Sequence, residues 1–291
     1  MITQNVIMTV LIGIVLTGVV PLIGGIVLLA THKIKASSFW AGVLAYVIAM
    51  IAYSIVSGII SMSVMISSGN IMTTGADIPP ALTAVLSAVL YIFIVLAMGI
   101  CIVGCMKKTR TFNGAVSCGL GFGAGYLITT AIGLVTMYTV FAQINSGNFD
   151  KQYASLIEMG AMDKEMVKSM KEVYTGFTVL DGFTEILAAA GFAILCIAAA
   201  VFIMRGACVK KAFAGIGISA LIFAAIGGAS ALIPNAVAGT VIFFAVGVAA
   251  LIFALRMKEQ IAVPEQPAAP ADSFIQSIEN AKSENTETSD N

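Results

Sequence analysis

Two carboxylates are the acidic side chains closest to an apolar run in this sequence. Asp181 and Glu185 lie four positions apart, so a helix would place both on one face. An unpaired charge inside a membrane is costly, so acids at such positions are interpreted by default as functional, for example as proton or cation sites. The structural alternative is that an acid at a helix start caps the helix and faces the positive end of its dipole. This pair is the candidate polar site.

The cysteines and the histidine offer a second kind of chemistry, which is metal binding. Cys101 and Cys105 share a helix face, but a zinc site normally needs three or four Cys, His or carboxylate ligands. The single histidine, His32, lies in another part of the chain. We therefore expect packing thiols, with no metal and no other cofactor.

The most unusual spacing is a run of four glycines in "SCGLGFGAGYLITT", residues 117–130. A helix would place Gly119 and Gly123 on one face and Gly121 and Gly125 on another, because two residues turn about 200°. Small residues four apart let transmembrane helices approach closely. A dinucleotide-binding loop is excluded, because the motif needs a preceding strand and a different glycine spacing. We predict a helix packed on two sides.

The elements that position these residues are membrane spans. The composition is 59% hydrophobic and 10% charged, and the mean hydropathy is +1.01, which is typical of an integral membrane protein. A membrane-crossing helix needs about 20 apolar residues. Seven runs reach that length: residues 6–30, 39–66, 81–106, 115–142, 180–204, 212–233 and 236–255. The prediction is an all-α bundle of seven transmembrane helices that contacts lipids and other membrane proteins and binds no nucleic acid.

The loop charges predict the orientation of the bundle. Basic residues follow the first, third, fifth and seventh spans: Lys33, Lys35, Lys107, Lys108, Arg110, Arg205, Lys210, Lys211, Arg256 and Lys258. The other loops hold Asp77, the uncharged pair Pro234 and Asn235, and a longer segment with four Lys against five Asp and Glu. Because cytoplasmic loops are rich in Lys and Arg, we expect an outside N-terminus and a cytoplasmic C-terminus in the plasma membrane.

Two segments are expected outside the lipid. Residues 144–178 carry apolar side chains at spacings of three and four, which predicts one or two amphipathic helices on the outer surface, acting as a cap or as a partner-binding lid. Residues 259–291 are rich in proline and acidic residues, which predicts a disordered cytoplasmic tail. Trp40, with Phe39 and Tyr46, is expected to anchor the second span at the interface.

The glycine run and the segments around it resemble those of a known protein family. "GLGFGAGYLI" after the basic "KKTRTFNGAV", with a span before it and a long amphipathic loop after it, resembles the YhfC family of intramembrane proteases of the glutamic or metallo type. The likeness extends over roughly residues 9–257. It implies a helix motif Gly-x-Gly-His-Gly-x-x-Glu, whose histidine and glutamate would fall at Ala124 and Ile128. The resemblance also implies paired glutamates and an arginine near Ile94, Val95 and Met98.

None of these positions holds an ionisable residue, so the resemblance implies a degenerate member without catalytic residues. Hydrolysis of a peptide bond needs one group to activate water and another to protonate the leaving amine. Three hypotheses remain: a non-catalytic protein that binds other membrane proteins or peptides, a small-solute or ion permease that uses Asp181 and Glu185, and a protease with displaced catalytic residues. The first is preferred, so the chain is not expected to be an enzyme.

Overall fold

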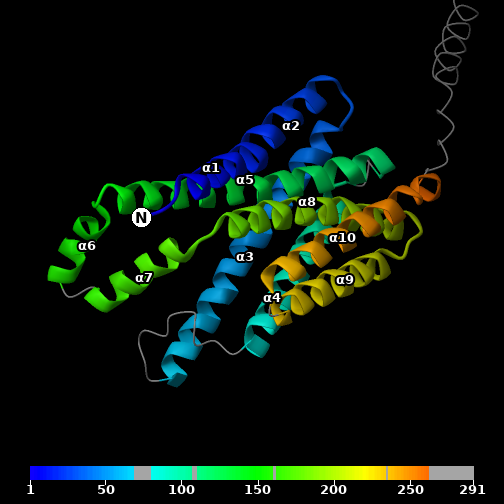
Figure 1. Ribbon diagram of the computed structural model, residues 1–291. Helices are drawn as coiled ribbons and strands as arrows, with labels where there is room; N and C mark the ends of the chain where they lie inside the picture. Colours follow the sequence, from blue (N-terminus) through cyan, green and yellow to red (C-terminus); the bar gives the residue numbers. More distant parts are fainter. Residues whose placement is uncertain (69–79, 107–109, 160–161, 234, 262–291) are drawn as a thin grey trace, which may run out of the picture. The chain divides into compact units, whose positions relative to one another are not determined.

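The computed structural model describes residues 1–68, 80–106, 110–159, 162–233 and 235–261 (Figure 1). Regular structure within these residues is helical. The elements are α1 Gln4–Ile14, α2 Val20–Ala30, α3 Ala36–Ser68, α4 Pro80–Ile100, α5 Phe112–Asn145, α6 Phe149–Glu158, α7 Lys164–Gly176, α8 Val179–Cys208, α9 Ala212–Leu232 and α10 Ala236–Leu255. Two π-helical segments, Val15–Val19 and Cys101–Cys105, and a 3₁₀ turn, Lys258–Ile261, complete the described chain.

Seven helical stretches are long and apolar enough to cross a membrane, which confirms the predicted all-α fold with seven spans. α1 and α2 form the first span together, and α3, α4, α5, α8, α9 and α10 form the others. The chain is a multi-pass membrane protein. Three of the helices are longer than their predicted apolar runs, since α3 begins at Ala36, α5 extends from Phe112 to Asn145, and α8 continues to Cys208.

Helix starts and ends follow from polar side chains and backbone geometry rather than from hydropathy. The Thr111 hydroxyl accepts a hydrogen bond of 3.1 Å from the Gly114 N–H at the start of α5. Asn235 accepts an equivalent bond of 3.1 Å at the start of α10. After the C-terminal ends of α2 and α8, His32 and Lys210 adopt φ angles of 53° and 58°, the left-handed conformation that stops a helix.

The first span is interrupted where α1 meets α2. Pro21 has no N–H to donate to the preceding turn, and the π-helical segment lies directly before it. The Thr17 hydroxyl donates to the Gly13 carbonyl at 2.7 Å within this segment. α1 buries four residues, whereas none of the residues of α2 is buried. α2 is therefore the loosely packed half of this span.

α8 lies at the centre of the bundle. In its spanning stretch 56% of the residues are buried, against 17–39% in the other six spans. It contacts α1, α5, α9 and α10, and Figure 1 shows α5 and α10 running along it. The small residues of 188–191 and 198–200 let these neighbours approach closely. The core of the bundle is built around this helix.

The four glycines of α5 contact two different helices. A Cβ atom on Gly119 would lie 2.5 Å from the Ile197 Cα of α8, and one on Gly123 would lie 3.1 Å from the Ala193 Cα. On the other face, a Cβ on Gly121 would overlap the Phe39 carbonyl of α3, and one on Gly125 would lie 2.5 Å from the Tyr46 ring. At Gly119 and Gly121 the closest contacts are with backbone atoms, so α5 fits between α3 and α8 only with glycine at these two positions.

The two ends of the bundle differ in charge. The basic end, where α2, α8 and α10 finish and α3, α5 and α9 begin, carries the described cations Lys33, Lys35, Arg110, Arg205, Lys210, Lys211, Arg256 and Lys258. The opposite end carries α6 and α7 (green in Figure 1). Lys107, Lys108, Asp77 and residues 262–291 lie outside the described residues. Of the predicted disordered tail, residues 259–291, the first three belong instead to the 3₁₀ turn Lys258–Ile261, and Ile261 is buried in the core cluster.

α6 and α7 occupy the segment for which amphipathic helices are expected. Phe149 of α6 and Val167 of α7 are buried in one cluster with Val10 of α1 and Phe141 of α5. Charged residues lie on the exposed sides, and Lys171 of α7 forms an ion pair of 2.7 Å with an α6 carboxylate. The two helices therefore cover the ends of α1 and α5.

Candidate functional site

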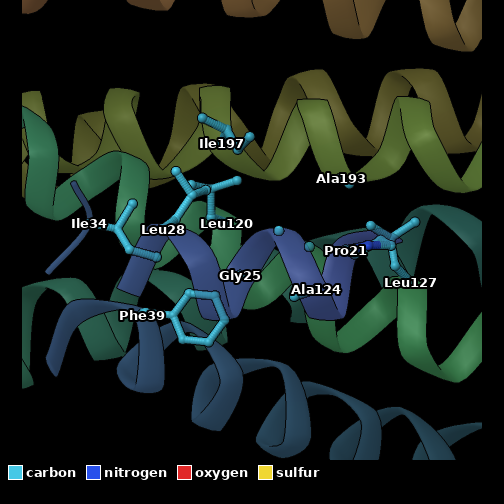
Figure 2. A pocket seen from close by; sticks show the side chains of 12 residues that line it. Pro21, Gly25, Leu28, Ile34, Phe39, Leu120, Ala124, Leu127, Ala193 and Ile197 are labelled. Carbon is cyan, nitrogen blue, oxygen red and sulfur yellow. The ribbon is translucent and has the colours of Figure 1, made fainter. Parts of the chain in front are cut away.

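An apolar cavity lies beside the glycine face of α5. Its volume is about 160 Å³, and twelve residues line it: Pro21, Gly24, Gly25, Leu28, Ile34, Phe39, Leu120, Gly123, Ala124, Leu127, Ala193 and Ile197. Figure 2 shows Leu28, Ile34 and Leu120 towards one end of this space and Pro21 and Leu127 towards the other. We refer to it as the apolar cavity.

The helical repeat explains why these residues meet. α2 and α5 each contribute residues at positions i, i+3, i+4 and i+7, which form one stripe along a helix. α8 closes the space with Ala193 and Ile197, which are four residues apart. The ring of Phe39 from α3 lies across the remaining side (Figure 2). Apart from Ile34, which lies between α2 and α3, the walls of the cavity are therefore regular helix faces.

Two glycines of α2 keep this space open. A Cβ on Gly24 would meet no described atom within 4 Å, and one on Gly25 would meet only the Phe39 ring tip, at 3.9 Å. Glycine at these positions therefore leaves room where a larger side chain would fill the cavity. An apolar cavity of about 150 Å³ stays dry and can bind a benzene-sized group. The space here can hold a branched or aromatic side chain.

The chemistry of this lining excludes proton transfer by its own side chains. None of the twelve lining residues carries an ionisable or hydrogen-bonding side chain. Ala124, at the position that the family resemblance assigns to histidine, lines the cavity, whereas Ile128 is 39% exposed and lines a neighbouring groove. The arrangement can bind apolar groups, but its side chains cannot activate water.

The other positions implied by the resemblance lie elsewhere. Ile94, Val95 and Met98 are buried in the core cluster with Phe122 of α5. Phe122 and Ala124 are two residues apart, so they point about 200° apart around the helix. The structure therefore does not bring these positions together with Ala124.

Asp181 takes part in a capping box at the start of α8. Its carboxylate accepts hydrogen bonds of 2.7 Å from both the backbone N–H and the hydroxyl of Thr178. The Thr178 hydroxyl accepts a bond of 3.3 Å from the Asp181 N–H in return. Thr178 is therefore the N-cap residue and Asp181 its partner in the first turn. This role stabilises the helix start and gives Asp181 a structural function.

Glu185 lies one turn further along α8 and is exposed. Asp181 of the same helix and Tyr126 of α5 lie near it. Ala188 and Phe192 follow it at spacings of three and four, so the three residues share one face of α8. This face leads from Glu185 into a second cavity.

The second cavity, which we name the tyrosine pocket, lies between α4, α5, α8 and α10. Its volume is about 300 Å³, and it is lined by Ser87, Tyr91, Tyr126, Ala188, Phe192, Ala236, Gly239, Thr240 and Phe243. The rings of Tyr126 and Phe192 lie 4.0 Å apart between centroids. The hydroxyl groups of Ser87, Tyr91, Tyr126 and Thr240 give this pocket hydrogen-bonding capacity that the apolar cavity lacks.

The five cysteines are free thiols. Cys101, Cys118 and Cys196 are buried in the core cluster, Cys105 is exposed at the end of the π-helical segment, and Cys208 is half-buried at the end of α8. Among the described residues, no three His, Cys, Asp or Glu side chains form a group that could hold a metal ion. The thiols of the core cluster pack as small apolar groups.

The sequence matches no family model, no curated protein and no solved structure. The resemblance to intramembrane proteases therefore stays a prediction from the glycine motif.

Sequence reasoning missed both cavities and misplaced two aromatic residues. Phe39 and Tyr46 were expected at the membrane interface together with Trp40, but only Trp40 is exposed, at 61%. Tyr46 is buried and donates a hydrogen bond of 2.7 Å to the Thr129 hydroxyl of α5. Two features of the sequence could have indicated these findings. The helix face that carries Gly125 must pack against another helix, and the adjacent glycines at positions 24 and 25 leave space beside α2.

Proposed function

We propose that this chain is a non-catalytic membrane protein that binds apolar segments of other membrane proteins. One observation carries the proposal: the apolar cavity of about 160 Å³ has twelve lining residues, and none of them has an ionisable or hydrogen-bonding side chain. Transmembrane helices associate through close packing and dispersion contacts. An apolar side chain of a partner helix that entered the cavity would make such contacts on several sides.

The loosely packed α2 supports access to the cavity. None of its residues is buried, and it follows a π-helical segment, a feature often found at functional sites. Gly24 and Gly25 leave the space unfilled at the cost of lower helix propensity. A helix built only for stability would place larger apolar side chains there.

The proposal also includes the orientation of the chain in the membrane and its relationship to a protein family. We propose that the basic end faces the cytoplasm, so that the N-terminus and α6–α7 lie outside the plasma membrane. We also propose that the chain is a degenerate relative of the YhfC-type intramembrane proteases, in which an apolar binding surface remains without an acid, a base or metal ligands.

Site-specific photocrosslinking in native membranes tests the binding function. A benzophenone side chain in place of Leu127, which lines the cavity, should form adducts with a transmembrane segment of another protein. The same group in place of Leu221, which is 73% exposed on α9 and lines no described cavity, serves as the control for unspecific contact with lipid or protein.

A cavity-filling substitution decides whether the adducts arise from the cavity. Gly24→Leu should remove the protein adducts at position 127 and leave the pattern at position 221 unchanged. If position 127 forms adducts only with lipid, or if Gly24→Leu leaves its protein adducts intact, the cavity does not bind a partner protein.

A permease is the second candidate function, favoured by the position of Glu185. This carboxylate shares a helix face with Ala188 and Phe192, which line the tyrosine pocket. Carboxylates and aromatic faces together bind small cations. Sodium or proton flux into vesicles that contain the purified chain, lost on Glu185→Gln, would support transport over protein binding.

A further inference from the structure

A third cavity lies between α8, α9 and α10 at the basic end of the bundle. Its volume is about 540 Å³, within the range of about 300–1,000 Å³ that is usual for ligand pockets. Arg205 of α8 and Lys211, which precedes α9, supply two cations to its lining. Phe202, Ile218 and Phe253 supply much of the apolar part. We refer to it as the basic pocket.

Backbone contacts hold the two residues that carry these cations close to each other. α8 and α9 approach so closely that a Cβ on Gly206 would lie 3.0 Å from the Gly215 Cα. The Lys211 N–H donates to the Gly206 carbonyl at 2.8 Å, and the Lys211 carbonyl accepts from the Ala214 N–H at 3.0 Å. The turn that joins the two helices therefore holds Lys211 close to the last turn of α8, which contains Arg205.

Neither cation forms an ion pair within the described part of the chain. The ion pairs found there are Lys168 with Glu172 and Lys171 with Asp150, and all four residues lie in α6 and α7. The Arg205 guanidinium donates to the Met257 sulfur at 3.6 Å, and a thioether is a weak acceptor. A cation in the last turn also stabilises α8 through its dipole, but that effect does not require a cavity around it.

The apolar side of the basic pocket continues into the lipid-facing surface. Ile218 and Phe253 line the pocket and are 54% and 58% exposed. Both lie within helices that span the membrane, so their exposed area faces hydrocarbon. A ligand that fits this pocket has an anionic group at one end and hydrocarbon at the other.

We propose that the basic pocket binds an anionic phospholipid. The phosphate of the lipid lies between Arg205 and Lys211, and the acyl chains of the lipid lie along Ile218 and Phe253. A guanidinium binds phosphate oxygens through two parallel hydrogen bonds, and a lysine adds a point charge. Basic pockets between transmembrane helices are suited to anionic lipid head groups. The basic pocket is separate from the apolar cavity, so this site does not depend on the proposed binding of partner proteins.

The test is lipid binding to the purified full chain in detergent, followed by native mass spectrometry. Phosphatidylglycerol and phosphatidylcholine with identical acyl chains are titrated in parallel. Both lipids carry the phosphate, but the choline of phosphatidylcholine adds a positive charge that cancels it. Arg205 and Lys211 should therefore favour the net anionic phosphatidylglycerol by about tenfold or more, because each cation is worth about 1 kcal/mol towards an anionic lipid. The double substitution Arg205→Gln with Lys211→Gln should bring the two affinities to within about twofold.

Matched controls separate the basic pocket from the general charge of this end. Lys210→Gln removes the neighbouring cation, which does not line the pocket, and should keep the preference for phosphatidylglycerol. Ile218→Trp fills the apolar part without a change in charge and should weaken the binding of phosphatidylglycerol several-fold. Inorganic phosphate at millimolar concentration should not compete with the lipid.

The proposal is wrong if the unmodified protein binds both lipids equally, a result that needs no variant to fold. It is also wrong if Lys210→Gln loses the preference as fully as the double substitution does. Competition by inorganic phosphate alone would assign the pocket to a free anion. A loss of photocrosslinks at position 127 would affect only the proposed binding function, so the two proposals fail separately.

Discussion

The glycines of α5 and those of α2 have opposite effects in the same bundle. Gly121 and Gly119 of α5 let the backbones of α3 and α8 approach, because a Cβ on either would overlap or crowd a main-chain atom. Gly24 and Gly25 of α2 have almost nothing within 4 Å, so they leave a cavity. The difference lies in the neighbours, since α5 is held between two helices whereas α2 follows a π-helical break and buries none of its residues. The same residue type therefore supports packing in one helix and open space in the other.

The largest expected effect is at Gly121. Gly121→Ala should destabilise the protein by about 1–3 kcal/mol or more, because the added methyl group meets the Phe39 carbonyl and α3 must move. Unfolding by heat or denaturant in detergent micelles measures the change. The control is Gly133→Ala in the same helix, where a Cβ meets no described atom within 4 Å. Equal losses at both positions would show that helix flexibility, and not close packing, explains the glycines of α5.

Alanine substitutions on the face of α5 that contacts α8 should lower the free energy of unfolding by different amounts. A Cβ on Gly119 would lie 2.5 Å from the Ile197 Cα, whereas one on Gly123 would lie 3.1 Å from the Ala193 Cα. We expect Gly119→Ala to cost about 1–2 kcal/mol and Gly123→Ala less than about 1 kcal/mol. The same unfolding assay ranks the two variants. The reverse order would mean that α8 does not approach α5 as the structure shows.

Much of the fold could be predicted from the sequence, because local rules determine it. Runs of about 20 apolar residues predict spans, and glycines spaced two and four apart predict two packing faces on one helix. The neighbours of those faces could not be predicted. Spans that are apolar all round carry little periodic signal, so the burial of Tyr46 against Gly125 depends on long-range packing. The tyrosine pocket could not be predicted for the same reason, because its lining depends on the long-range packing of four separate helices.

A smaller effect is expected in α2. Gly24→Ala should leave the free energy of unfolding unchanged or raise it by up to about 1 kcal/mol, because alanine favours the helix and its methyl group enters empty space. The measurement is the same assay, with Gly121→Ala for comparison. A loss at Gly24 as large as the loss at Gly121 would remove the distinction between the two helices, because it would show that α2 is packed as tightly as α5.

The smallest expected effect is at Glu185, which lies outside the two sets of glycines compared above. Its side chain is exposed, and the start of α8 is already stabilised by the capping box of Thr178 and Asp181. Glu185→Gln should therefore change the free energy of unfolding by less than about 0.5 kcal/mol. It should also leave the photocrosslinks at position 127 intact, because the apolar cavity has no polar lining residue. Asp181→Ala provides the contrast, since loss of a capping interaction costs about 1 kcal/mol. If Glu185→Gln instead abolishes crosslinking at position 127, the carboxylate and the apolar cavity act as one site, and the space left by Gly24 and Gly25 alone does not account for partner binding.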